Sequence, residues 1–141
     1  MENKIVIVER VFNAPISKVW KAITDKDEMK LWYFDLAEFK PEVGFKFQFT
    51  GGTPEQQYIH LCEITEVIPQ KKLTYSWIYK GYEGCSYVTF ELSEQPQDKT
   101  LLKLTHIDID TFPQDKPDFA IHNFEAGWDS IINTSLKEYL E

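Results

Sequence analysis

The first 24 residues change from an alternating pattern of apolar and polar positions to a helical one. In KIVIVERVF, residues 4–12, the side chains alternate with a period of two, which predicts a strand with one face better suited to a core. Pro15 then suits the first position of a helix, because its φ angle is already close to the helical value. The apolar residues that follow recur at i, i+3, i+4 and i+7, which predicts an amphipathic helix: Ile16, Val19, Trp20 and Ile23.

A second short helix is expected directly after the first. The segment EMKLWYF, residues 28–34, is preceded by Asp27, whose side chain can accept a hydrogen bond from a free backbone N–H at a helix start. In this prediction Asp27 caps the helix, and Leu31 and Trp32 point inward.

From Val43 to Asp108 the period is two again, over five further segments. The segments GFKFQF, YIHLCEITEV, KLTYSWIY, SYVTFEL and TLLKLTH each read as a strand. Turn-forming residues fill the short connections between them, and connections of that length predict antiparallel neighbours in a meander. The residues predicted to share one face within a strand are Phe45, Phe47 and Phe49; Leu73, Tyr75, Trp77 and Tyr79; Val88, Phe90 and Leu92; and Leu102, Leu104 and His106.

A long amphipathic helix is predicted from near Pro117 to the end of the chain. Its apolar positions recur at helical spacing: Ile121, Phe124, Trp128, Ile131, Ile132, Leu136 and Tyr139. Gly127 costs about 1 kcal/mol relative to Ala inside a helix. We therefore expect that backbone or a bulky ring approaches the helix closely at that point.

Together these elements predict an α+β fold. One six-stranded antiparallel sheet has to cover its apolar face with the long helix, and two short helices follow the first strand. A curved sheet that wraps around the C-terminal helix is the helix-grip arrangement, and it leaves room for a cavity between the two. Residues 1–141 are expected to form a single domain, since no repeat or linker interrupts the pattern.

Charge and composition exclude several classes of partner. The formal net charge is −8, which repels phosphate backbones and anionic lipid surfaces, so neither nucleic acid binding nor membrane insertion is expected. No long apolar run or signal peptide is present, and a cytoplasmic location is expected. In that compartment Cys62 and Cys85 are expected to be plain thiols rather than a disulfide.

Several segments resemble the START-like superfamily of helix-grip proteins. They are ERVFNAPISKVWKAITD, KLWY, the stretch from Ile68-Pro69 to Leu73-Thr74-Tyr75-Ser76-Trp77, VTFEL and LKLTH. The closing GWDSIINTSLKEYLE is similar to one branch, the activator of heat-shock protein 90 ATPase homologue family. The resemblance runs from about Val8 to Leu140. It implies a cavity for apolar molecules and no shared catalytic residues. The chain has no counterpart to the separate N-terminal domain of the eukaryotic activator, which argues against a co-chaperone role.

Catalytic and metal-binding motifs are absent from the sequence. The three histidines, His60, His106 and His122, lack the HxH or HExxH spacing of a metal site, and neither metal nor cofactor is predicted. His106 is either a polar anchor facing the cavity or a core histidine with satisfied hydrogen bonds, and the second reading is favoured. Asp108 and Asp110 are expected in a solvated loop. No catalytic residue is assigned.

The aromatic residues, 15% of the chain, carry the remaining signal. Tyr and Trp are awkward core fillers, because each buried O–H or N–H needs a partner. They either fill the space between sheet and helix or leave a partial cavity, and we expect the cavity. The candidate ligand-binding residues are Trp32, Phe47, Tyr58, Tyr75, Trp77, Tyr79, His106, Phe124 and Trp128.

Three functions follow from this interpretation. The first is non-enzymatic binding of a small hydrophobic or aromatic molecule in the cavity. In that case Trp32, Tyr75, Trp77 and Trp128 form its walls, and His106 with a tyrosine hydroxyl orients the polar end of the ligand. The second is a protein-binding module, for a chaperone or another protein, by analogy with the activator. The third is an enzyme of the cyclase or hydrolase kind. The first is the prediction, and the sequence does not identify the ligand or the oligomeric state.

Overall fold

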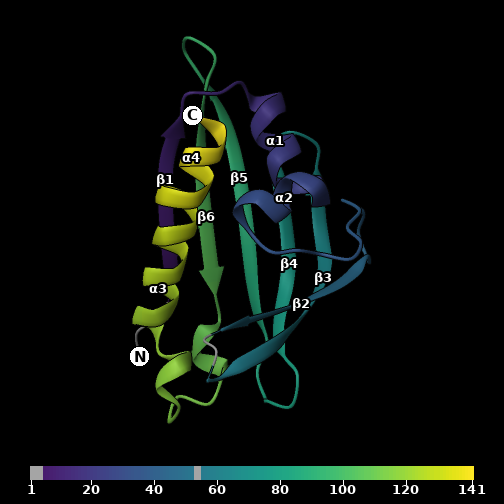
Figure 1. The fold of residues 1–141 in the computed structure, drawn as a ribbon, viewed down its shortest axis with the longest axis vertical. Coiled ribbons are helices and arrows are strands. Elements are labelled where there is room, and N and C mark those ends of the chain that lie inside the picture. The colour runs from purple at the N-terminus through teal and green to yellow at the C-terminus, as the bar shows by residue number, and fades with distance from the viewer. Residues whose placement is uncertain (1–4, 53–54) are drawn as a thin grey trace.

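The sheet has six antiparallel strands. Strands β2 to β6 follow one another as a meander, and β1 lies at the edge of the sheet beside β6. We describe residues 5–52 and 55–141 of a computed structural model. The strand order is β1-β6-β5-β4-β3-β2, so the first strand pairs with the last (Figure 1). The strands are β1 (Val6–Phe12), β2 (Lys46–Gly52), β3 (Gln57–Ile68), β4 (Lys72–Tyr79), β5 (Ser86–Gln95) and β6 (Lys99–Ile107). This is the predicted meander, with the sheet open and curved.

Two short helices follow β1, as predicted. Helix α1 (Ile16–Thr24) buries Val19, Ala22 and Ile23 and packs against β5 and β6. Pro15 holds an extended conformation at its N-cap, one position before the first helical residue. The strand β1 ends at Phe12, and Pro15 fixes the backbone just before the helix begins at Ile16.

The predicted cap and one predicted core residue of α2 (Lys26–Trp32) are wrong. Asp25 is the N-cap, and its side chain accepts a hydrogen bond of 2.9 Å from the Asp27 backbone N–H. An N-cap needs an extended backbone, which Asp25 has, whereas Asp27 already lies in the first helical turn. Trp32 is buried as expected, but Leu31 is 67% exposed. Met29 and Trp32, three residues apart, share the buried face of α2, and Leu31 lies about 100° around the helix from Trp32, on the side away from Met29.

The C-terminal helix begins later than predicted and changes its winding. Residues Pro117–Phe119 form a 3₁₀ turn, labelled η2, and α3 (Ile121–Ser130) starts after it. A π-helical segment, η3 (Ile131–Leu136), and α4 (Lys137–Leu140) continue the same rod (Figure 1). Its buried residues lie four apart: Phe124, Trp128, Ile132, Leu136 and Leu140.

The π-helical segment explains how a four-residue repeat stays on one face. In an α-helix each step of four residues overshoots the turn by about 40°, so the stripe would drift around the rod. A π-helical turn holds more residues, because its hydrogen bonds span i to i+5. The segment therefore takes back part of the drift and keeps Leu136 and Leu140 against the sheet.

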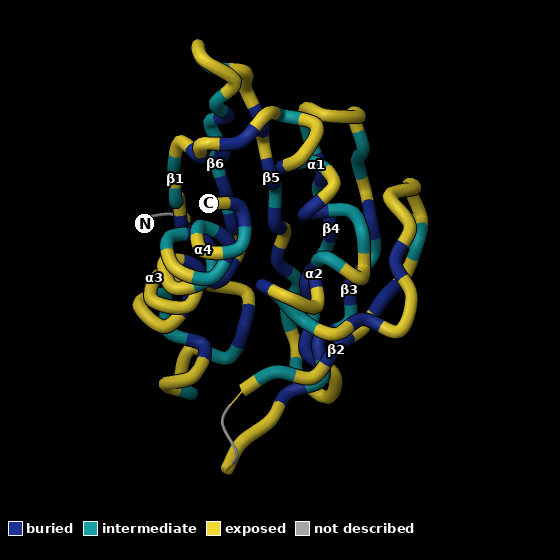
Figure 2. The backbone as a smooth tube through the Cα atoms, turned by 45° about the horizontal axis from the view of Figure 1, so that its top comes forward, coloured by how far each residue is buried: buried dark blue, intermediate teal, exposed yellow. Residues whose placement is uncertain are grey.

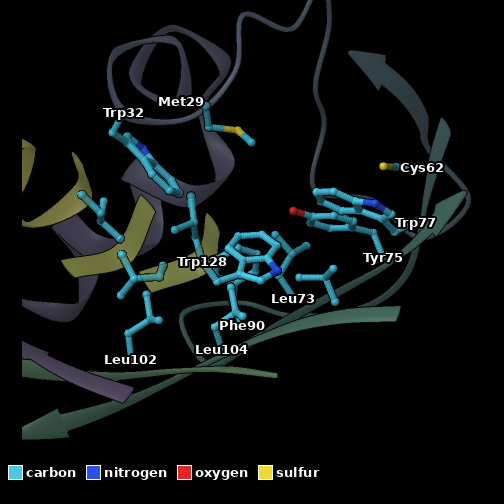
Figure 3. Close-up of a cluster of buried hydrophobic side chains, with 14 of the residues drawn as sticks. Met29, Trp32, Cys62, Leu73, Tyr75, Trp77, Phe90, Leu102, Leu104 and Trp128 are labelled. Carbon is cyan, nitrogen blue, oxygen red and sulfur yellow. The ribbon is translucent and has the colours of Figure 1, made fainter. Parts of the chain in front are cut away.

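The core lies between the concave face of the sheet and this helix. Along β4 every second residue is buried, namely Leu73, Tyr75, Trp77 and Tyr79, as the alternation predicts. Figure 2 shows that buried positions along the strands are separated by less buried ones. In Figure 3, Trp128 of the helix lies over Phe90 and Leu104, with Trp32 and Met29 of α2 above it. Phe45 precedes β2 and is only half-buried, while Phe47 and Phe49 are buried.

Candidate functional site

A pocket opens at one end of the interface between sheet and helix. It has a volume of about 260 Å³ and lies among β3, β4, the first half of the C-terminal helix and the segment after α2. We call it the aromatic pocket, and its ring-bearing walls are Phe34, His60, Trp77, Tyr79, Phe124 and Trp128. The rest of its lining is Gly52, Asp118, Asn123, Gly127 and Ile131. An adjoining hollow of about 450 Å³, the outer hollow, shares several of these residues and adds Tyr58, Gln56 and Phe119.

Strand register brings the rings of the pocket together. Trp77 and Tyr79 lie two apart on the buried face of β4. His60 on β3 pairs with Tyr79 on one side and with Phe49 of β2 on the other. The His60 ring stacks on Phe49 at 4.5 Å and meets Trp77 and Tyr79 edge-on at 4.9 and 4.8 Å. Phe34 stacks on Phe49 at 4.1 Å and closes the side toward α2.

Gly127 keeps the helix side of the pocket open. No described atom outside its own helix turn would lie within 4 Å of a Cβ built there, so the expected close approach of backbone or a ring is wrong. The glycine lines both the aromatic pocket and the outer hollow. A side chain at this position would project into that space, so the helix gives up about 1 kcal/mol of propensity and the opening remains.

His60 is neutral in this environment. Burial lowers its pKa to about 4, against the opposing effect of the Tyr58 and Phe49 backbone carbonyls. Its Nδ1 lies 3.0 Å from the Tyr58 carbonyl oxygen, so Nδ1 carries the proton and donates. An imidazole held by backbone carbonyls has no carboxylate partner of the kind that orients a general base. It serves as a flat, uncharged wall.

His106 lies behind the pocket wall instead of on it. It is fully buried, and its ring nitrogens are both occupied by side chains. The Trp128 indole N–H donates to Nδ1 at 3.0 Å, and Nε2 lies 2.7 Å from the Ser86 hydroxyl oxygen. Since that hydroxyl donates to the Trp77 carbonyl, Nε2 carries the proton and donates to Ser86. His106 is thus a core histidine with satisfied hydrogen bonds, made by side chains.

Three other predicted cavity residues also belong to the packed core. The Trp32 indole N–H donates to the Ala22 carbonyl at 2.9 Å. The Tyr75 hydroxyl is bonded to that of Tyr33 at 2.8 Å. Phe47 packs edge-on against Tyr75 at 5.1 Å. Of the nine candidates, Trp77, Tyr79, Phe124 and Trp128 line the aromatic pocket and Tyr58 lines the outer hollow.

An acidic group stands at the mouth. Asp118, in the η2 turn, accepts a hydrogen bond of 2.5 Å from the Tyr58 hydroxyl, which ties this turn to the start of β3. Burial and this hydrogen bond raise the pKa of Tyr58, so the phenol stays protonated. The Lys116 ammonium lies over the Tyr82 ring at 5.5 Å, and neither residue lines the aromatic pocket or the outer hollow. Asn123 donates from Nδ2 to the Pro117 carbonyl and fixes the start of α3.

Sequence reasoning missed Phe34, His60, Asp118 and Asn123 as pocket residues. The short turn between β3 and β4 would by itself place His60 opposite Lys80. A β-bulge between Ile64 and Glu66 shifts the pairing by one residue and brings His60 opposite Tyr79, and the sequence pattern does not reveal that bulge. Asp118 and Asn123 lie where the chain passes from a 3₁₀ turn into α3. The spacing of apolar residues there does not indicate that the helix begins only after this turn. Phe34 follows α2 in a segment without regular structure.

Metal chemistry finds no support in residues 5–52 and 55–141, where no three His, Cys, Asp or Glu side chains gather. Asp108 and Asp110 are exposed, as expected of a solvated loop. Cys62 and Cys85 are both free thiols.

A further hollow, of about 390 Å³, lies over the outer face of β2, β3 and β4 among Lys46, Gln48, Glu63 and Ser76. Phe47, a predicted cavity residue, is the one ring-bearing residue in its lining, compared with six in the aromatic pocket. No helix in the described part of the chain is long and apolar enough to cross a membrane.

The curved sheet gripping a long C-terminal helix, with a pocket between them, defines a START-like helix-grip protein. Within this class, residues 13–141 match the family described as Activator of Hsp90 ATPase homolog 1-like protein, and the chain belongs to it. A search of the curated proteins found no significant match.

Solved structures share the fold over nearly the whole chain. Protein MLL2253 from Mesorhizobium loti is 26% identical, with a TM-score of 0.75 and 96% of each chain covered. The Aha1 dimer from Colwellia psychrerythraea is 21% identical, with a TM-score of 0.73 and 100% of this chain and 97% of that one covered. DynU16, from the dynemicin biosynthetic locus, is 22% identical with a TM-score of 0.79, and the alignment spans 99% of this chain but 48% of DynU16.

Proposed function

We propose that this protein binds a small hydrophobic or aromatic molecule in the aromatic pocket and does so without chemical conversion. The observation that carries the proposal is a hollow with six ring-bearing walls, kept open by a glycine on the covering helix. Concave, mostly apolar sites with few polar groups are typical of small-molecule binding. DynU16 comes from a biosynthetic locus for a small molecule, which agrees with such a role.

Apolar burial supplies the affinity in this proposal. A ligand that covers roughly 200 Å² of apolar surface gains about 5 kcal/mol at about 25 cal/mol per Å². Part of that gain is offset by the loss of translational and rotational freedom. We therefore expect dissociation constants in the micromolar to millimolar range for simple aromatic probes.

Two substitutions at Gly127 test the site. The probe is N-phenyl-1-naphthylamine, a neutral dye whose fluorescence rises on leaving water. In Gly127→Leu the new side chain enters the open space, and we expect binding to weaken about tenfold or more, equivalent to about 1.4 kcal/mol. Gly127→Ala is the matched control, since one methyl leaves most of the space free. Equal binding by Gly127→Leu and the wild type would rule out this pocket as the site.

Native mass spectrometry of the purified protein complements the titration. A bound molecule would add mass to the folded protein, and the excess would disappear after denaturation. If Gly127→Leu purified without the added mass while Gly127→Ala retained it, the captured molecule would be assigned to the aromatic pocket.

A second candidate function is docking of a protein on the outer face of the sheet. Ile7 is 54% exposed, and Ile107 and Tyr87, which pair across β6 and β5, are 37% and 36% exposed. The Aha1 protein from Colwellia psychrerythraea is described as a dimer, so a second copy is the partner to test first. Sedimentation velocity over a concentration series would show self-association, and Ile7→Lys should abolish it. A wild-type protein that stays monomeric throughout excludes the second copy.

A further inference from the structure

One wall of the aromatic pocket carries two polar groups without hydrogen bonds of regular geometry to other described residues. Tyr79 is 6% exposed and lines both the pocket and the outer hollow. Among the described residues its hydroxyl is contacted by the Trp77 indole N–H, which lies outside regular hydrogen-bond geometry. The buried indole N–H of Trp77, two residues earlier on the same face, also lacks a hydrogen-bond acceptor among the described residues.

These two groups are neighbours. Burial raises the pKa of Tyr79, and the nearby indole N–H of Trp77 acts against that rise. The two rings meet edge-on with their centroids 6.3 Å apart, and the indole N–H makes no hydrogen bond of regular geometry to the phenol oxygen. A phenol oxygen approached by a donor leaves its own O–H free to donate elsewhere. Hydrogen bonds in such a chain strengthen one another, so a partner for the Tyr79 O–H would also improve the contact with Trp77.

The other tyrosine and tryptophan groups near the pocket are occupied. Trp128 donates to His106, the Tyr58 hydroxyl donates to Asp118, and Tyr75 is bonded to Tyr33. Buried polar groups in folded proteins are nearly always paired in this way. Among the described pocket rings, Tyr79 and Trp77 are the exceptions, and both line the pocket.

Charge sets a further limit on the ligand. The Asp118 carboxylate stands at the mouth, and none of the described residues lining the aromatic pocket is Lys or Arg. His60 is uncharged there, and the whole chain has a net charge of −8. An anionic ligand would lose its hydration without gaining a positive partner, which is costly.

We propose that the aromatic pocket takes an uncharged, flat aromatic molecule whose acceptor oxygen receives a hydrogen bond from the Tyr79 hydroxyl, beside the ring of Trp77. This inference rests on the proposed binding function and names its ligand class. Tyr79 takes the anchoring role that the sequence suggested for His106, because both nitrogens of His106 are already bonded.

Three matched probes test the proposal by isothermal titration. 2-Acetylnaphthalene carries an acceptor oxygen, 2-ethylnaphthalene has nearly the same shape without it, and 2-naphthoate carries a negative charge. We expect the wild type to prefer 2-acetylnaphthalene to 2-ethylnaphthalene by about tenfold, the worth of one hydrogen bond to a buried donor. We expect 2-naphthoate to bind weakest of the three.

The variants separate an anchor from a merely packed ring. Tyr79→Phe should lower the preference to about one, because it deletes the oxygen and keeps the ring. Tyr139→Phe is the matched control: it removes a hydroxyl bonded to Glu28, away from the pocket, and should leave the preference unchanged. If Tyr79→Phe failed to fold, the carbonyl stretching band of 2-acetylnaphthalene bound to the wild type would decide. A hydrogen-bonded carbonyl absorbs at lower frequency than the same ketone in hexane.

The outcomes distinguish two failures. If neither naphthalene binds, the proposed function itself falls. If both bind the wild type equally, or the bound carbonyl absorbs as it does in hexane, the pocket is a binding site but Tyr79 is not its anchor. Tighter binding of 2-naphthoate than of 2-acetylnaphthalene would overturn the assignment of an uncharged ligand.

Discussion

Mild acid should destabilise this fold strongly, because two buried histidines remain uncharged in it. Burial lowers the pKa of His60 from 6.5 to about 4 and that of His106 from 6.5 to about 3. In the unfolded chain both imidazoles titrate near their ordinary value. Below pH 6.5 the unfolded chain therefore binds two protons that the folded protein does not. The stability is fully present above this pH and falls as the pH drops toward the folded values.

The size of the effect follows from the two pKa values. Each pKa unit of difference corresponds to about 1.4 kcal/mol. Lowering the pH from 8 to 5 should therefore reduce the free energy of unfolding by about 4 kcal/mol, comparable to the whole stability of a marginal domain. The net charge of −8 acts in the opposite direction, since protonating carboxylates relieves self-repulsion, but that effect is spread over the surface.

Urea denaturation followed by tryptophan fluorescence measures this dependence. Near pH 5.5 the free energy of unfolding should change by about 2.5 kcal/mol per pH unit. His60→Gln should remove about half of that slope, because one of the two proton-binding differences disappears. His122→Gln is the matched control, since it removes an exposed imidazole of α3 in place of a buried one. A free energy of unfolding that stays flat between pH 7 and pH 5 would refute the assignment of two neutral buried histidines.

Two further predictions concern the helices. Asp25→Ala should lower the free energy of unfolding by about 1 kcal/mol, because it removes the cap of α2; Asp27→Ala, measured by the same denaturation, should cost less. Gly127→Ala should raise it by up to about 1 kcal/mol, since the new methyl meets open space and alanine is the better helix former. A destabilised Gly127→Ala protein would show that the space beside the helix is filled.

Most of the fold could be predicted from the sequence, because the spacing of apolar residues distinguishes strands from helices and shows which face of each is buried. Alternation placed Tyr75, Trp77 and Tyr79 on one buried face, and the structure confirms that placement. Antiparallel pairing followed from short connections. The failures are local: the cap of α2 falls on Asp25, and Leu31 is exposed. Both depend on where the first helical turn begins, and periodicity defines helix ends only to within a few residues.

The site was less predictable, because a pocket depends on which rings are already satisfied. By residue type, Trp32 and Tyr75 are as good pocket candidates as Trp77 and Tyr79. They differ in their hydrogen bonds, since the Trp32 indole N–H donates to the Ala22 carbonyl and the Tyr75 hydroxyl is bonded to that of Tyr33. Those partners come from distant parts of the chain, so the alternating pattern of one strand does not reveal them.

The place of the pocket follows from the chemistry of the covering helix. Its last buried residues, Ile132, Leu136 and Leu140, are aliphatic, and flexible aliphatic chains fill the space above the sheet to high density. Its first buried residues, Phe124 and Trp128, are rigid rings that face other rigid rings. Rigid rings that meet at steep angles leave gaps between them. Gly127, between Phe124 and Trp128 on the helix, has no side chain to fill such a gap. The hollow therefore opens at the aromatic end of the helix, and a helix-grip sequence with a glycine between two buried aromatic residues should place its ligand there.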